Sequence, residues 1–200
     1  MAISEVLAAL YSGDRERALA SARGQELTAF EAAALGDGDA LRRALARRPE
    51  WAREFSEDGF TALHLAAFFA AEREVLTTLV EAGADVDAEA RNAMRVHPLN
   101  SAAAGGNVEA VELLLDRGAQ VDVPQGGGYT ALHSAASNGN LALVRRLVER
   151  GADRSAISDD GRTPADIARE RGHVAVADDL ATEPGLRPAP PSGENREPLA

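Results

Sequence analysis

Apolar residues recur at helical spacing in several stretches of the chain. In residues 75–80, 111–115 and 144–148, valines and leucines stand at positions i, i+3 and i+4, which lie on one face of an α-helix. A glycine follows each stretch within a few residues: Gly83, Gly118 or Gly151. A glycine just past a helix can take the left-handed conformation that closes the helix. The pattern therefore predicts an amphipathic helix in front of each of these glycines.

A second pattern precedes these stretches and repeats at a nearly fixed interval. Similar segments begin with "LTAF", "FTAL", "VHPL", "YTAL" and "RTPA". Their alignment brings one residue of each into register, namely Thr28, Thr61, His97, Thr130 and Thr163. The intervals are 33, 36, 33 and 33 residues. Because a threonine can cap a helix and a period near 33 indicates a repeat array, we expect units of helix, short turn, helix and extended loop.

The longer interval, from Thr61 to His97, holds three extra residues. We place one of them in the turn between the two helices of that unit, around residues 68–73. The other two fall in the loop of residues 87–97. That loop is therefore expected to form a longer finger than the loops of the neighbouring units.

These motifs resemble the signature of the ankyrin repeat family. The segment "GYTALHSAASNGN" followed by "VRRLVERGAD" is similar to Gly-x-Thr-Pro-Leu-His-x-Ala-Ala, then Gly-Asn/His, then Val-x-x-Leu-Leu-x-x-Gly-Ala-Asp. The signature histidine is present as His64 and His133, whereas Glu31, Asn100 and Asp166 replace it in the other units. The resemblance covers about residues 28–181, and it implies a structural role for the two matching histidines.

The resemblance implies an all-α fold, an ankyrin solenoid of helix-turn-helix units with extended loop (β-hairpin) fingers. We expect one repeat domain over residues 1–182, with repeats that start near residues 28, 61, 97, 130 and 163. A degenerate helix pair over about residues 3–26 is expected to cap the N-terminal end. Residues 183–200 contain five of the nine prolines, and their low hydrophobicity predicts a disordered tail.

Composition and charge narrow the classes of partner. The net charge of −11 works against binding to nucleic acid. The absence of cysteine excludes disulfides and thiolate sites. All 21 basic residues are arginine, and the chain contains no lysine. Alanine is also abundant. This compositional bias indicates a bacterial-type protein. With no pattern typical of a secretory signal and no apolar run long enough to span a membrane, we expect a soluble, cytoplasmic monomer without a membrane partner.

Candidate chemistry is sparse. The glycines of residues 126–128 precede a predicted helix, but a phosphate-binding loop of the nucleotide type needs a lysine, and the chain has none. Gly128 also aligns with glycines of other units, so we interpret it as a turn residue. None of the four histidines has a histidine partner at the spacing of a metal site. We therefore expect no enzyme activity and no cofactor, with no catalytic, cofactor-binding or metal-binding residues.

The resemblance also implies protein recognition. In the ankyrin architecture, partner proteins bind a concave face lined by the loop tips and by exposed positions of each first helix. Phe60 and Tyr129 are expected to project from loops with no core beneath them, whereas Phe68 and Phe69 could instead fill the space left by the inserted residue. The predicted partner-binding residues are Phe60, Phe68, Phe69, Met94, Arg95, Val96, Tyr129, Ser137, Asn138 and Arg162.

Two functions are open for such a surface. The first is a non-catalytic protein-protein interaction module, an adaptor or scaffold that binds a partner protein through its concave face. The second is an inhibitory or regulatory subunit, similar to an antitoxin or immunity protein, that blocks a partner enzyme. Both would use the same surface.

Overall fold

The computed structural model describes residues 3–69 and 71–182, so the predicted tail lies outside the described residues. The α-helices in these ranges are short, from seven to ten residues each. They are α1 (Glu5–Tyr11), α2 (Arg15–Ala22), α3 (Ala29–Leu35), α4 (Gly38–Arg47), α5 (Ala62–Phe68), α6 (Arg73–Glu81), α7 (Pro98–Gly105), α8 (Val108–Asp116), α9 (Ala131–Ser137), α10 (Leu141–Glu149), α11 (Pro164–Glu170) and α12 (Val174–Ala181), and a 3-10 helix, η1 (Pro49–Ala52), lies between α4 and α5.

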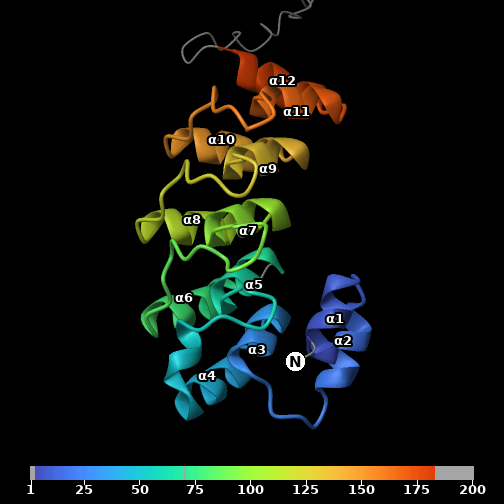
Figure 1. Ribbon diagram of the computed structural model, residues 1–200, viewed down its shortest axis with the longest axis vertical. Helices are drawn as coiled ribbons and strands as arrows, with labels where there is room; N and C mark the ends of the chain where they lie inside the picture. The colour runs from blue at the N-terminus through green and yellow to red at the C-terminus, as the bar shows by residue number, and fades with distance from the viewer. Residues whose placement is uncertain (1–2, 70, 183–200) are drawn as a thin grey trace, which may run out of the picture.

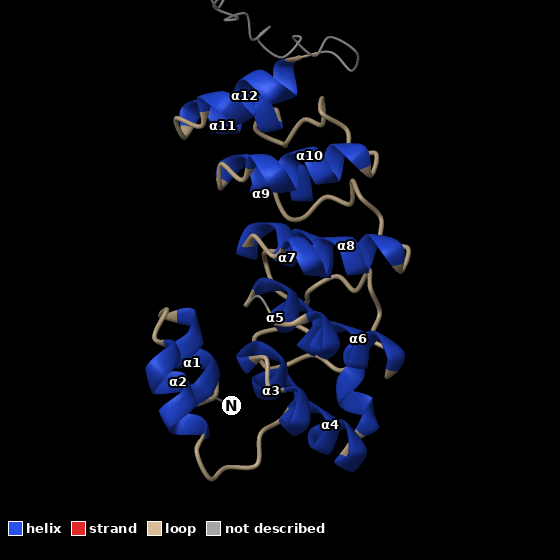
Figure 2. Cartoon of the chain, turned by 180° about the vertical axis from the view of Figure 1, so that it is seen from behind, coloured by secondary structure: helices blue, strands red, loops and turns tan. Residues whose placement is uncertain are grey.

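From α3 onward the helices form a stack of pairs (Figure 1). The first helices of the pairs, α3, α5, α7, α9 and α11, form one row, and the second helices form the other. Consecutive first helices pack against one another, as do α4 with α6, α6 with α8 and α10 with α12. The buried apolar side chains of both rows form one continuous core. Seen from behind, the same two rows run the length of the stack (Figure 2). The all-α solenoid predicted from the sequence is confirmed.

The first helices approach one another closely because small residues fill the space between them. Ala32, Ala66, Ala102 and Ala135 are fully buried in α3, α5, α7 and α9. At the end of α7, a Cβ atom on Gly105 would collide with the backbone of α5. The second helices bury larger leucine and valine side chains instead. Alanine is therefore placed where the backbones must come closest.

The helix ends follow the predicted pattern. The side chains of Thr28, Thr61 and Thr163 accept a hydrogen bond from the backbone N–H three residues later, at the start of α3, α5 and α11. Gly83 and Gly151 follow α6 and α10 with φ angles of 91° and 95°. In this left-handed region an added side chain would be strained, which explains why glycine stands there. The threonine caps and the glycine helix ends are confirmed.

The loops between the pairs form fingers, and a backbone hydrogen bond closes the base of each finger. In three fingers the donor and acceptor are four positions apart, as for the bond from Ser56 N–H to the Phe60 carbonyl (2.8 Å). In the finger that precedes α7, the bond runs from Ala90 N–H to the Val96 carbonyl, six positions apart (2.8 Å). The two extra residues predicted for this finger are therefore confirmed.

Neighbouring fingers are also bonded to one another. The N–H of Arg91 donates to the carbonyl of Gly59, and the N–H of Gly126 donates to the carbonyl of Met94, both at 2.8 Å. The residues described by the structure contain no β-strand and a single isolated antiparallel bridge. The fingers expected from the sequence are present, but they lack the paired strands of a β-hairpin. The fingers are tight turns, because each is too short for a ladder of paired residues.

The two signature histidines connect α5 and α9 to the finger of the next repeat. His64 Nδ1 lies 2.7 Å from Thr61 Oγ1, and its Nε2 lies 3.0 Å from the Val96 carbonyl. His133 makes the same bridge to the Arg162 carbonyl at 3.1 Å. Burial lowers the pKa of both imidazoles, to about 4 for His64. The histidines are therefore neutral at pH 7, and their role is structural.

The N-terminal pair, α1 and α2, lies beside the stack (Figures 1 and 2). It lies on the side of the first helices, next to α3 and α5, and α1 contacts α3. This position differs from the expected cap beneath the first repeat. The side of α4 that faces the chain before α3 carries the exposed arginines Arg43 and Arg47. Since such a polar surface can face water, the first repeat does not need a helix pair stacked on its end.

Replacing Leu114 with alanine tests the packing of the stack. Leu114 is fully buried in α8, so Leu114→Ala should lower the free energy of unfolding by about 2–5 kcal/mol, the usual cost of a core cavity. Denaturant titration measures this loss. Leu115→Ala, at a half-buried neighbour, should cost less. A loss at Leu114 no larger than that at Leu115 would contradict the assigned helix face.

The buried histidines should make stability depend on pH. His64 has a pKa of about 4 in the folded state and about 6.5 when unfolded, so its stabilising effect is complete above pH 6.5 and is lost as the pH falls toward 4. Through His64 alone, the free energy of unfolding should fall by about 2 kcal/mol between pH 7 and pH 5.

Urea titrations at both pH values test this dependence. His64→Asn is the informative variant, because asparagine stands at the same repeat position as Asn100. The variant should lose clearly less stability between pH 7 and pH 5 than the wild-type chain. Equal losses in the two proteins would assign the dependence to other groups.

Candidate partner-binding surface

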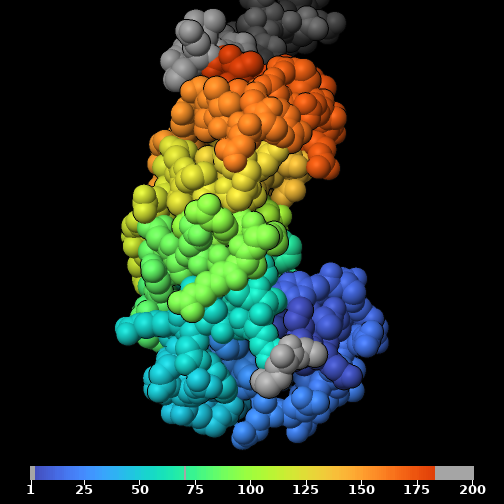
Figure 3. Space-filling model, viewed as in Figure 1, coloured from blue at the N-terminus to red at the C-terminus, as the bar shows by residue number. Residues whose placement is uncertain are grey.

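The predicted partner-binding residues belong to one side of the stack, which we call the inner face. It is formed by the first helices, α3, α5, α7, α9 and α11, and by the fingers that precede them. Because the fingers are bonded to each other and to the helices, they hold their side chains on a rigid scaffold. The N-terminal pair stands against one end of this face as a separate block, blue in Figure 3. The predicted residues fall into three groups along the face.

The group nearest the C-terminal end surrounds an open cleft of about 330 Å³. The cleft is lined by α9, α11, the end of α7 and the two fingers next to α9 and α11. Four of the predicted residues line it: Tyr129, Ser137, Asn138 and Arg162. The other residues of its lining are not among the predicted partner-binding residues; they are Ala104, Gln125, His133, Ser134, Ile167 and Arg171.

Tyr129 and Arg162 are held in place by a polar network. The Tyr129 hydroxyl donates to Asp160 at 2.7 Å, and the Arg162 guanidinium bonds to the same carboxylate and to Glu170 at 2.9 Å. The guanidinium carbon lies 5.7 Å from the centre of the Tyr129 ring. Hydrogen bonds from Arg162, Ser158 and Tyr129 lower the pKa of Asp160, so this carboxylate is charged at neutral pH. The network fixes an aromatic ring and a cation at the mouth of the cleft.

Arg171 lines the cleft but is not among the predicted partner-binding residues. It stands at the end of α11, in the same register as Asn138 at the end of α9. Its side chain is exposed and forms no ion pair with any residue that the structure describes. Arg162 and Arg171 are the charged groups of the cleft lining, and the first is already bound to two carboxylates. Arg171 therefore offers an uncommitted cation to a partner.

Ser137 and Asn138 line the cleft at the end of α9. The Asn138 amide donates to the Ala104 carbonyl at 2.9 Å, which joins the end of α9 to the end of α7. The Ser137 carbonyl lies 3.1 Å from His173 Nε2. Both predicted residues therefore also support the helix ends around the cleft.

The second group, Phe60, Phe68 and Phe69, lies at α5. Phe60 and Phe69 are half-buried against the core, and Phe68 is 43% exposed. The expectation that Phe60 and Tyr129 have no core beneath them is wrong. Their rings lie 5.9 Å and 5.6 Å from the buried rings of His64 and His133, respectively, because the signature histidine fills the space under each finger.

The third group belongs to the longer finger. Met94 is 57% exposed at its tip, and Arg95 is bound to Glu89 through two hydrogen bonds of 2.8 and 3.1 Å. Val96 is buried, and its carbonyl accepts the hydrogen bond from His64. Val96 is therefore not available to a partner, and its selection by register alone is corrected here.

The described residues offer neither a metal site nor a membrane-spanning helix. Within residues 3–69 and 71–182, histidine and carboxylate side chains do not gather in groups of three or more that could hold a metal ion. No helix in these ranges is long and apolar enough to cross a bilayer.

Comparison with known proteins agrees with this architecture. The model of the family described as ankyrin repeats (3 copies) matches residues 30–125 and 99–189. A plant protein, the probable E3 ubiquitin-protein ligase XBOS31 of Oryza sativa subsp. japonica, is 43% identical over 97 residues, which is 48% of this chain and 21% of that protein. The chain thus spans about a fifth of the length of this curated relative. Since the family model matches most of the chain, the protein belongs to the ankyrin repeat family.

Proposed function

We propose that this protein is a non-catalytic recognition module that binds a partner protein at the cleft between α9 and α11. Ankyrin repeats generally mediate binding to other proteins, which supports the general class. The observation that carries the proposal is the convergence of Tyr129, Ser137, Asn138 and Arg162, predicted from repeat register, on one open cleft.

The composition of the cleft supports a binding role. Tyrosine and arginine are enriched among the residues that dominate protein-protein binding energies. Tyr129 and Arg162 are held in place by Asp160, so they lose little side-chain entropy when a partner binds. Arg171 and the hydroxyl of Ser134 add donors that a partner could use. The cleft thus combines a fixed aromatic ring with polar groups that orient a ligand.

The partner would extend beyond the cleft itself. A stable interface buries about 800 Å² on each partner, more than one cleft of this size provides. The longer finger, with the exposed side chain of Met94 at its tip, offers the adjacent surface. Gly126 of the next finger is bonded to Met94, so the two areas are continuous.

We propose the role of an adaptor or scaffold, and we place the protein in the cytoplasm, as a partner-bound module of a soluble complex. An inhibitory subunit would use the same cleft, so the binding surface does not depend on this choice. The similar plant protein is a probable ubiquitin ligase, but the match covers 21% of its length and supports no ligase activity for this chain.

A charge reversal at Arg171 tests the proposal. The partner is first captured by affinity from the source organism and identified, and its binding is then measured by titration. The double variant Arg171→Glu, Tyr129→Ala should bind it at least tenfold more weakly, as expected when interface anchors are lost. Tyr129→Ala removes a half-buried ring, so the melting temperature of the variant is measured alongside.

The matched control is Arg117→Glu. Arg117 also caps the C-terminal end of a helix, but that helix, α8, belongs to the row of second helices. The control should capture the same partner at wild-type strength. If the cleft variant remains folded and binds as tightly as this control, the cleft is not the binding site.

A further inference from the structure

The N-terminal pair occupies part of the inner face. The Tyr11 ring, at the end of α1, lies 5.7 Å from the Phe69 ring at the end of α5. The Tyr11 hydroxyl donates to Asp58, in the finger that precedes α5. Tyr11 thus touches both components of the inner face, a finger and a first helix. This contact is the counterpart of the Tyr129–Asp160 bond at the open end of the face.

The pair is attached to the stack mainly through α1, and α2 contributes little. In α2 only Ala18 is buried, and Leu19 is 46% exposed. The Arg15 guanidinium donates to the Leu35 carbonyl at 2.8 Å, at the end of α3. The apolar residues of α1, such as Leu7 and Leu10, are buried. One helix of the pair therefore provides nearly all of its burial, and Tyr11 and Arg15 provide its polar attachments.

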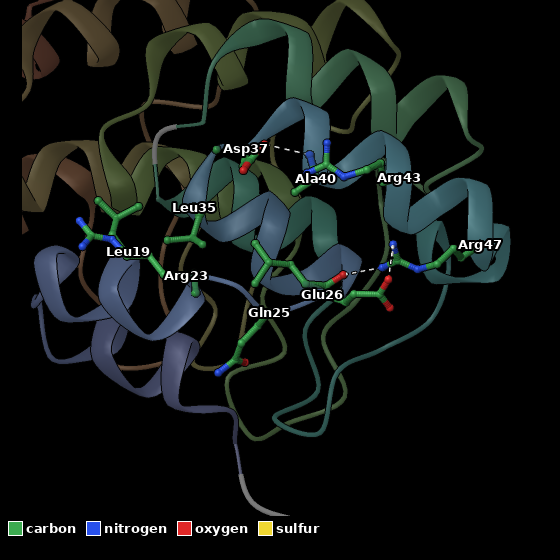
Figure 4. A pocket seen from close by; sticks show the side chains of 12 residues that line it. Leu19, Arg23, Gln25, Glu26, Leu35, Asp37, Ala40, Arg43 and Arg47 are labelled. Atoms are coloured by element: carbon green, nitrogen blue, oxygen red, sulfur yellow. Dashed lines mark hydrogen bonds and ion pairs between the residues drawn. The ribbon is translucent and has the colours of Figure 1, made fainter.

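The seam between the pair and the first repeat is open. A cleft of about 540 Å³ lies there, with Leu19 and Arg23 on one side and Asp37, Arg43 and Arg47 on the other (Figure 4). This cleft opens to solvent, so the α2 side of the pair is not sealed against α4. The pair is joined to α3 by a short connection in which Gly24 has a φ angle of 72°. The pair is thus a discrete unit that this connection tethers to the stack.

We propose that α1 and α2 are an exchangeable occupant of the inner face, and that the patch beneath Tyr11, formed by Asp58 and Phe69, is a second docking surface. The partner that fits this patch is a helix that presents an aromatic ring with a hydrogen-bond donor, as α1 presents Tyr11. Such a helix would displace the pair and take its place. This inference is independent of the cleft between α9 and α11.

The chemistry of Tyr11 suits a reversible contact. Burial and the neighbouring Asp58 carboxylate raise the pKa of its hydroxyl, which stays protonated and donates at any physiological pH. The ring is still 42% exposed, so water reaches its edge. An element near the end of the chain opens at a lower free energy than the centre of the stack. A competing helix needs only to supply the contacts that one side chain and one short helix now make.

Hydrogen exchange of backbone amides tests whether the pair opens separately. In the wild-type chain, amides of α1 and α2 should exchange much faster than those of α7 and α8. In Tyr11→Ala, exchange of α1 and α2 should become faster by about tenfold, while α7 and α8 keep their rates. Tyr129→Ala, which removes the equivalent ring at the other end of the face, should leave α1 and α2 unchanged. Exchange of α1 and α2 at the rate of α7 and α8 in the wild-type chain would show a fixed cap and overturn the proposal.

A peptide tests the docking surface itself. A synthetic peptide of residues 3–23 is added to the isotope-labelled, full-length Tyr11→Ala protein, and the NMR signals of Asp58 and Phe69 are followed. These signals should shift with the peptide and much less with a peptide that carries the same Tyr11→Ala change. The wild-type protein, whose own pair fills the patch, should respond less than the variant. Absence of shifts in the variant, or equal shifts with the two peptides, would overturn the docking surface.

Discussion

The close approach of the first helices is the constraint on which the rest of the structure depends. Buried alanines such as Ala66 and Ala102, and a glycine at Gly105 where the next backbone passes, set the distance between consecutive repeats along this row. The row of second helices is filled by leucine and valine, which hold its members further apart. A stack that is narrow along one row and wide along the other presents its first helices on an inner face. Small buried residues therefore shape the inner face, the candidate binding surface, without being exposed on it.

Hydrogen bonds hold the fingers rigidly along the inner face. His64 and His133 each reach from a first helix to the finger of the following repeat, and backbone hydrogen bonds join one finger to the next. A side chain at the base of a finger is consequently supported by a buried imidazole, as for Tyr129. The same support that holds Tyr129, a candidate contact residue, also removes part of its ring from solvent. A residue with a structural role, such as His133, therefore lies next to a candidate contact residue, such as Tyr129.

Much of this arrangement could be predicted from the sequence because it is local. Helix caps, helix-ending glycines and the length of the finger before α7 depend on residues a few positions apart, and the repeat register carried them from one unit to the next. The repeat register did not predict exposure or ion pairing correctly, because contacts between neighbouring repeats determine both. It selected Val96, whose side chain is buried, and it gave no means of knowing that Arg162 is bound to carboxylates while Arg171 is not. Exposure and ion pairing depend on contacts between units, which a single-unit pattern does not contain.

The position of the N-terminal pair follows from what each surface of the first repeat offers. The side of α4 next to the α2–α3 connection carries Arg43 and Arg47, and burying two guanidinium groups beneath a helix pair would be costly without paired carboxylates. The inner face at α5 offers instead an aromatic ring at Phe69 and a carboxylate at Asp58, which suit the single tyrosine of α1. The pair therefore lies where it can bury a ring, beside the stack. A surface that attracts a segment of its own chain in this way has the chemistry to attract a similar helix from another protein.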